Sequence, residues 1–175
     1  MTGSSGGSDT VGDLTELFRR LSTGVYVVGV AAGDRRNAFT AAWLTQVSFD
    51  PLLVALSVNP GNASWPLLVE GGGFVVNVLR RGQLDLAERF GTHSGRDEDK
   101  LAGIPWRPAP SGAPILTDAA AWLDCRLHAR HPAGDHEIVL ARPVGGRLVA
   151  PEAAPLLYRD TGDLDGSREL YPDAL

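Results

Sequence analysis

Asn37-Ala-Phe-Thr-Ala-Ala-Trp-Leu-Thr-Gln-Val-Ser-Phe-Asp-Pro51 leads into an apolar run from Leu52 to Val58 and then into Asn59-Pro-Gly-Asn-Ala-Ser-Trp-Pro66. The first two segments are rich in β-branched, aromatic and aliphatic residues, which is typical of strands. The third is small and polar, and it precedes a short apolar stretch that can continue as a helix. This part of the chain therefore predicts two consecutive strands, a tight turn and the start of a helix.

The turn carries the first functional indication. Asn62 and Ser64 are residue types that cap helix N-termini, Pro66 suits a first helical turn, and Gly71 would end the helix. A helix start exposes unpaired N–H groups and a partial positive charge, so hydroxyl and amide side chains beside it predict a phosphate-binding site. An ordinary capped surface helix is the alternative, and the turn alone does not decide between them.

The preceding strand segment carries the second indication. Small residues there leave space against the backbone, and polar residues that can donate and accept hydrogen bonds interrupt the hydrophobic pattern. A flat ring could dock on such a surface, whereas the alternative is a half-buried amphipathic strand with a wet polar face. The small residues are Ala41 and Ala42, and the polar ones are Thr40, Thr45, Gln46 and Ser48.

Length and composition fit one globular domain. The chain has 175 residues, 43% of them hydrophobic, and a net charge of −5 without a basic stripe, so we expect no nucleic-acid partner. No apolar run reaches the 18 residues of a membrane span, and the N-terminus has no export signal, so we expect a cytoplasmic protein. We expect a flexible N-terminal tail over 1–12, one domain over 13–160 and a C-terminal tail over 161–175.

The rest of the chain alternates strand patterns with short helical ones and lacks regular βαβ units, which favours a mainly β antiparallel barrel over a doubly wound sheet. Pro143 cannot donate to a sheet ladder, so the last strand should end or bulge near it. The predicted helices cover 13–21 and 83–90, and the predicted strands cover 25–30, 74–79, 115–130 and 136–140, the last two separated by a turn over 131–135. The polar loop 92–106 lies on the surface and is a candidate cover for a site.

Several other chemistries lack support in the sequence. Gly71-Gly-Gly73 is out of order for a dinucleotide fingerprint and is a turn before the strand at Phe74. The four histidines lack partner ligands, so we expect no metal site, and no nucleophile elbow is present. Cys125 alternates onto an apolar face and is expected to be a buried core residue.

Four blocks together resemble the flavin reductase-like proteins with an FMN-binding split barrel. This family includes reductase components of two-component flavin monooxygenases, flavoredoxins and flavodiiron-associated reductase modules. The blocks follow the family's order and spacing over residues 13 to 160. They are Phe39–Pro51, Asn62–Trp65, Phe74–Leu79 with Leu86–Gly91, and Gly134–His136.

The resemblance implies a mainly β, Greek-key-like split β-barrel that is homodimeric and binds FMN, with FAD possible. It implies an NAD(P)H-dependent flavin reductase that supplies reduced flavin or electrons to a partner monooxygenase or another redox protein. A flavoredoxin-like electron carrier and a non-catalytic flavin- or haem-binding protein are the alternatives. The choice between NADH and NADPH stays open.

Carried over residue by residue, the resemblance also implies the site. His136 would position the nicotinamide and is the candidate catalytic residue, although it could instead be a strand-start histidine bonded to Asp135 or to water. The flavin contacts would be Thr40, Ala41, Ala42, Trp43, Thr45, Gln46, Val47 and Ser48 at the ring, Ser57, Val58 and Asn59 along the ribityl chain, Asn62, Ala63 and Ser64 at the phosphate, and Arg89 and Phe90 as further contacts.

Overall fold

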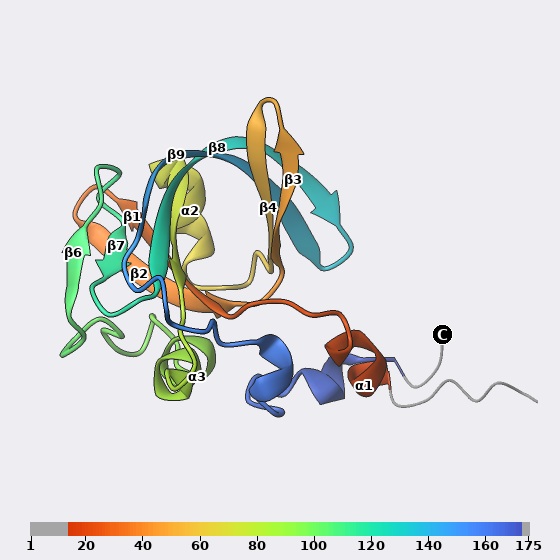
Figure 1. Ribbon diagram of the computed structural model, residues 1–175. Helices are drawn as coiled ribbons and strands as arrows, with labels where there is room; N and C mark the ends of the chain where they lie inside the picture. Colours follow the sequence, from red (N-terminus) through yellow and green to blue (C-terminus); the bar gives the residue numbers. More distant parts are fainter. Residues whose placement is uncertain (1–13, 173–175) are drawn as a thin grey trace, which may run out of the picture.

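The computed structural model describes residues 14–172, so the tail expected over 1–12 lies outside the described residues (Figure 1). Strands dominate and the helices are short, as the sequence predicts. The elements are α1 (Leu14–Arg19), β1 (Tyr26–Ala32), β2 (Arg35–Ala41), β3 (Leu44–Phe49), β4 (Leu52–Val58), α2 (Trp65–Gly71), β5 (Gly73–Val78), α3 (Leu84–Thr92), β6 (Trp106–Pro108), β7 (Pro114–Leu116), β8 (Ala121–Ala133), β9 (His136–Leu148) and the 3-10 helices η1 (Tyr158–Asp160) and η2 (Ser167–Leu170).

Seven of these strands form one antiparallel sheet in the order β2-β1-β5-β8-β9-β4-β3. The long β8–β9 hairpin stands in the middle of the order and curves over between the two halves of the sheet (Figure 1). Strands β2 and β3 are consecutive in the chain, yet they form the two opposite edges of the sheet. The short connection at 42–43 therefore lies where the two edges come together.

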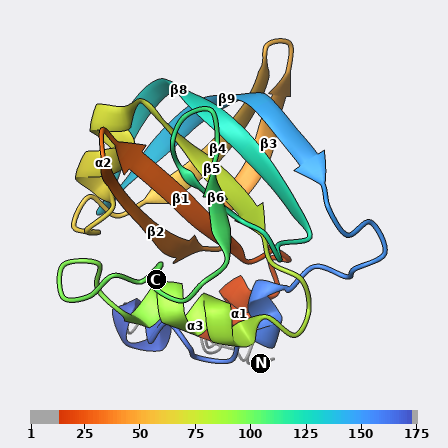
Figure 2. The same cartoon turned by 90° about the vertical axis from the view of Figure 1, so that its left-hand side faces the viewer.

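The main core fills the concave side of the sheet and is covered by α2. Val28, Phe39, Leu56 and Phe74 are buried there from four strands, together with Leu68 of α2. Alternating strand residues supply this face, which is the period-two pattern expected for a half-buried sheet. Figure 2 shows α2 lying beside β1 at this end of the molecule.

The glycines at the end of α2 permit its close approach to the sheet. A Cβ on Gly71 would lie 1.8 Å from the Ala31 carbonyl oxygen, and Gly72 ends the helix with φ 68°. Both conditions favour glycine, because a side chain would clash or strain the backbone. The predicted turn before the strand at Phe74 is confirmed.

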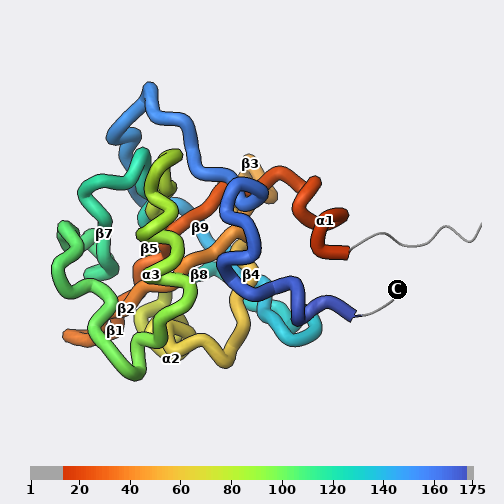
Figure 3. Tube along the Cα trace, turned by 90° about the horizontal axis from the view of Figure 1, so that it is seen from below, coloured from red at the N-terminus to blue at the C-terminus, as the bar shows by residue number. Residues whose placement is uncertain are grey.

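A second cluster packs α3 against the other side of β1 and β2. Ala87 and Phe90 of α3 are buried with Val25 and Val27, and Tyr158 of the C-terminal segment packs with them. Seen from below, α3 and the C-terminal segment run side by side under the sheet (Figure 3). The chain's end therefore helps to build the surface next to α3.

Cys125 is a core residue, as expected. Its side chain is buried on β8, and burial raises the pKa of its thiol to about 12. A thiol with such a pKa carries almost no thiolate at neutral pH, so it is chemically inert in the folded chain.

The predicted strands after residue 114 need correction. The expected strand 115–130 is divided, since β7 ends at Leu116 and β8 begins at Ala121 and continues to Ala133. The following strand continues beyond the expected end at residue 140 to Leu148. The bulge expected near Pro143 is confirmed, since Asp124 pairs with Gly145 and Cys125 pairs with Pro143. A bulge leaves one residue outside the ladder, so a proline without an N–H is tolerated beside it.

The expected C-terminal tail is also corrected for the described residues up to 172. Thr161 and Ser167 are buried, and the Tyr158 hydroxyl donates to Asp165 at 2.8 Å. Asp163 pairs with Arg19 of α1 at 3.2 Å, so the segment is attached to the N-terminal helix. No helix within residues 14–172 is long and apolar enough to span a membrane.

Candidate functional site

The edge strands β2 and β3 and the connection at 42–43 between them form what we call the seam of the sheet. The Ser57 N–H donates to the Trp43 carbonyl at 2.9 Å, which fixes the 42–43 connection against the end of β4. Thr40 donates its hydroxyl to the Ala87 carbonyl of α3 at 2.7 Å, so this group holds α3 in place. Thr45, Gln46 and Val47 are exposed on β3.

Two predicted contacts point away from this surface. Val58 is 2% exposed and Phe90 is 1% exposed, and both side chains belong to the core. Neither side chain is available to a ligand, although the Phe90 backbone lines a pocket described below. The outward side chain near the end of β4 is instead that of the partly buried Ser57. Directly after the strand, Asn59 is exposed.

The turn after β4 is fixed by its own asparagines. Asn59 Oδ1 accepts from the Gly61 N–H at 2.8 Å, and Asn62 Oδ1 accepts from the Ser64 N–H at 2.9 Å. These bonds make local turns that compete with helical hydrogen bonding. The N–H of Ser64, at the start of α2, is therefore already occupied, and the Asn62 amide nitrogen remains to meet a ligand.

Ser64 itself differs from the expectation. It is the N-cap of α2 but makes no side-chain cap bond, and it is fully buried. Within residues 14–172 its hydroxyl is one of three buried polar side-chain atoms without a hydrogen-bond partner. Burying an unpaired hydroxyl costs about 1–3 kcal/mol, so such a group calls for a partner that the protein alone does not supply.

A pocket of about 240 Å³ opens between this turn, the end of α3 and the loop after it. The loop is tied across the pocket, because Arg96 donates to the Gly61 carbonyl at 3.0 Å. Lys100 lies at the base, 4% exposed, and its ammonium donates to the Phe90 carbonyl at 3.1 Å. Burial lowers the pKa of Lys100 to about 8, against a smaller opposite effect of Glu98.

Arg89 has a role that the sequence did not indicate. Its guanidinium donates to the carbonyls of Lys100 and Ala102, each at 2.8 Å. It therefore fastens the loop that carries Lys100 and is neither a solvated helix charge nor a free phosphate clamp. The surface loop expected over 92–106 does border the candidate site, and these two arginines hold it there.

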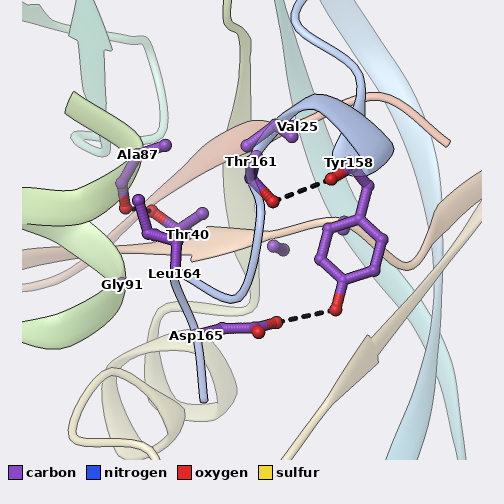
Figure 4. Close-up of a pocket in the computed structure, with 10 residues that line it drawn as sticks. Val25, Thr40, Ala87, Gly91, Tyr158, Thr161, Leu164 and Asp165 are labelled. Carbon is purple, nitrogen blue, oxygen red and sulfur yellow. Dashed lines mark hydrogen bonds between the residues drawn. The ribbon is translucent and has the colours of Figure 1, made fainter. Parts of the chain in front are cut away.

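A smaller pocket of about 90 Å³ continues from Gly91, which lines both pockets (Figure 4). Thr40, Ala41 and Ala42 form one wall, as expected for a ring-binding surface. The opposite wall is the C-terminal segment, with Tyr158, Thr161, Leu164 and Asp165. The sequence analysis did not predict these residues. The one signal for them is the aromatic Tyr158, which stands directly before an acidic segment.

His136 lies at the other end of the seam. It begins β9 beside the end of β4, where Glu137 pairs with Val58, and its ring centroid is 5.0 Å from that of Trp43. Its Nδ1 and Asp135 Oδ1 are 2.9 Å apart, and this contact lowers the pKa of Asp135. The fold thus brings together His136 and Trp43, which are 93 residues apart in the chain.

These groups fit a phosphorylated planar ligand. The first pocket is lined by the Lys100 ammonium and the Asn62 amide, both of which can donate to a phosphate. The unpartnered Ser64 hydroxyl belongs to the same turn but is not part of the pocket lining. The second offers small side chains beside a flat seam. No group of three potential metal-ligating side chains occurs in the described part of the chain.

The comparisons with known proteins identify the family of the chain. The flavin reductase-like domain model matches residues 18–165. The chain belongs to this family. The resemblance seen in the sequence is thereby confirmed, and the match includes residues 161–165 of the C-terminal segment.

Three relatives show what the chain is similar to. A flavin reductase of Pseudomonas putida is 35% identical over 80% of this chain and 84% of its own length. The reductase subunit HsaB of a flavin-dependent monooxygenase of Mycobacterium tuberculosis is 33% identical over 86% and 79%. The structure of an NADH:FAD oxidoreductase of Streptomyces globisporus superposes with a TM-score of 0.78 at 31% identity, covering 85% and 88%.

A further structure of the Streptomyces protein contains NAD and FAD fragments. Other relatives are much longer. The chain spans about a quarter of the length of the Nostoc and Synechocystis diflavin flavoproteins that it matches at 33–36% identity.

Proposed function

We propose that this protein is an NAD(P)H-dependent flavin reductase that binds FMN, or the FMN half of FAD, and supplies reduced flavin or electrons to a partner monooxygenase. The observation that carries the proposal is the pocket lined by Asn62, Ala63 and the buried Lys100, which shares Gly91 with the pocket along Thr40, Ala41 and Ala42. The unpartnered Ser64 hydroxyl follows in the same turn. Family membership and the relatives' names support it.

The bound flavin would supply the redox chemistry, accepting hydride from a nicotinamide. The protein's own groups bind and orient. The Asn62 amide and Lys100 hold the phosphate, Ser64 donates from below, and the small residues Ala41 and Ala42 leave room for the ring. The Trp43–His136 ring pair borders the nicotinamide, and His136 orients the donor.

We also propose a homodimer with the split-barrel arrangement. Phe49 is 88% exposed at the end of β3, beside Val47 and Leu52, which are each about half exposed. The same hairpin includes sheet edge β3. An exposed apolar edge of this kind is normally covered, and a second copy would cover it next to the ring site.

The proposed activity is tested by mixing the purified protein with FMN and either nicotinamide and following the loss of nicotinamide absorbance. Flavin-dependent oxidation is the expected result. If flavin binds but no nicotinamide is consumed, the protein is a carrier or a binding protein, and reductase activity is refuted. Flavin retention on a desalting column then separates a bound cofactor from a released product.

A further inference from the structure

The pocket along Thr40, Ala41 and Ala42, here called the ring pocket, is small for the ring that it is proposed to hold. Its volume is about 90 Å³, whereas pockets for ligands of this kind measure ~300–1,000 Å³. The wall at the seam is part of the sheet, and the opposite wall is the C-terminal segment. A flavin ring can therefore enter only if the C-terminal wall moves.

Residues 162–166 of that wall, which we call the strap, reach the junction between the ring pocket and the phosphate pocket at Asn62 and Ala63. Gly91 lines both pockets. The Leu164 Cδ2 atom is 3.9 Å from the point that a Cβ on Gly91 would occupy, and the Thr40 Cβ is 3.4 Å from that point (Figure 4). Leu164 therefore lies where a flavin would pass from its phosphate to its ring.

Glycines bound the strap at both ends. Gly162 and Gly166 have φ values of 65° and 64°, a backbone region that favours glycine. The residues just outside them, Thr161 and Ser167, are buried, whereas most of the strap is exposed. A short exposed segment between two anchored glycine positions has the construction of a hinged lid.

Polar contacts hold the strap in its closed position. Asp165 accepts from the Tyr158 hydroxyl at 2.8 Å, which is a contact within the C-terminal segment. Asp163 Oδ1 lies 3.2 Å from Arg19 Nη2, and this ion pair ties the strap to α1. The Asp163 side chain is 45% exposed. Because ion pairs with solvent-exposed partners stabilise a structure little, this tie can open readily.

We propose that the strap is an autoinhibitory gate, and that the flavin ring binds only after the Arg19–Asp163 pair separates and the strap swings out on its two glycines. The inference rests on the proposed function. When only the open state binds a ligand, the apparent dissociation constant equals the intrinsic one divided by the open fraction. Weakening the ion pair should therefore tighten flavin binding.

Stopped-flow fluorescence with FMN and flavin-free protein measures the effect. Asp163→Asn keeps the oxygen that accepts from the Arg168 N–H but removes the charge, and Arg19→Gln removes the guanidinium. Each variant should associate with FMN about twofold to fivefold faster, the scale of an exposed ion pair. The dissociation rate constant should stay unchanged, so FMN affinity should rise by the same factor.

The two variants change the net charge in opposite directions, which separates the gate from the long-range field. Arg19→Gln makes the protein more negative, so the field alone would slow the approach of an anionic flavin. Slower association in Arg19→Gln with faster association in Asp163→Asn would show a field effect and overturn the gate. Arg35→Gln is the matched control, because it removes the same charge and breaks the Arg35–Glu70 pair between β2 and α2. It should not speed association.

Amide hydrogen exchange tests the motion itself. The Gly166 N–H donates to the Asp163 carbonyl at 3.1 Å, and it should exchange faster in both variants and in the wild-type protein with FMN bound. Slower exchange of the strap with FMN would mean that the strap closes over the flavin, which overturns autoinhibition. Should Arg19→Gln fail to fold, strap exchange in Asp163→Asn decides.

The kinetics also separate this inference from the proposed function. Unchanged association in both variants, with flavin-dependent nicotinamide oxidation intact, overturns the gate and leaves flavin reduction standing. A wild-type protein that binds no flavin overturns both proposals.

Discussion

Replacing Ser64 by Ala should stabilise the flavin-free protein and weaken flavin binding at the same time. The Ser64 hydroxyl is fully buried and has no partner in the described chain. A substitution that removes only this oxygen leaves the backbone bonds of the turn in place, since Asn62 accepts from the Ser64 N–H and not from its hydroxyl. The two opposite effects distinguish a donor kept for a ligand from a merely structural residue.

The magnitudes follow from the burial. An unsatisfied buried hydroxyl costs about 1–3 kcal/mol, so Ser64→Ala should recover about 1 kcal/mol, or about 2–4 °C in Tm for a chain of this size. A hydrogen bond to a charged phosphate contributes about 1.5–3 kcal/mol. Its loss should raise the flavin dissociation constant about 10-fold to 100-fold, since about 1.4 kcal/mol is a factor of ten.

Differential scanning calorimetry without flavin and fluorescence titration with FMN and FAD measure the two effects. Thr23→Val is the matched control, because Thr23 Oγ1 is also buried without a partner but lies outside the turn whose residues Asn62 and Ala63 line the phosphate pocket. It should raise Tm without changing flavin affinity. A lower Tm for Ser64→Ala, or an unchanged flavin affinity, would refute the reasoning and make this hydroxyl a structural feature only.

His136→Ala should leave flavin affinity nearly unchanged and slow flavin reduction by NADH about 10-fold to 100-fold in stopped-flow measurements, because the side chain only orients the donor; lost flavin binding would contradict this role. Phe49→Asp should convert the proposed dimer to a monomer in sedimentation velocity, because it places a charge in the proposed apolar interface. Identical sedimentation of the variant and the wild-type protein would exclude this surface. Flavin affinity should fall as pH rises through about 8, where Lys100 loses its charge, whereas Lys100→Met should bind weakly without this pH dependence. The flavin-free protein should conversely gain stability from pH about 8 toward 10.5. Over that range the unfolded chain keeps the Lys100 proton that the folded chain has released. A free energy of unfolding that falls over this range would contradict the lowered pKa of Lys100.

The local patterns of the sequence predicted most of the fold. The strand over 52–58, the turn and the short helix that ends at Gly71 occur where expected, because alternation and small-polar turn residues act within a few residues of one another. The single strand expected over 37–51 is wrong, since the connection at 42–43 divides it between β2 and β3. The strand predicted over 115–130 was wrong because a break between Leu116 and Ala121 has no glycine or proline to mark it. Turns fixed by distant contacts leave little local signal.

Strand parity separates the side chains that the resemblance implies on β4. Val54, Leu56 and Val58 alternate inward, so the opposite face carries Ser57 and, past the strand, Asn59. The resemblance covers a contiguous stretch and so implies Val58 as well, whereas a strand presents only every second side chain to one face.

Arg89 and the C-terminal segment could not be predicted in the same way. The acceptors of Arg89 are backbone carbonyls of a loop that begins after its own helix, and any residue type supplies a carbonyl. Tyr158, Asp165 and Ser167 form a network that orders an acidic, glycine-containing stretch. Its composition resembles a solvated tail, and only the tertiary contacts override that preference.

The groups left with unused donors reveal how the site is organised. The Ser64 hydroxyl comes from the turn before α2 and the Lys100 ammonium from the loop after α3, and both are donors. The protein carries a net charge of −5, so its long-range field repels an anionic flavin, and local donors must offset that repulsion. Because these donors are buried, added salt screens the repulsion more than it screens the contacts. Moderate ionic strength should therefore weaken flavin binding little, in contrast to an anion site built from exposed lysines.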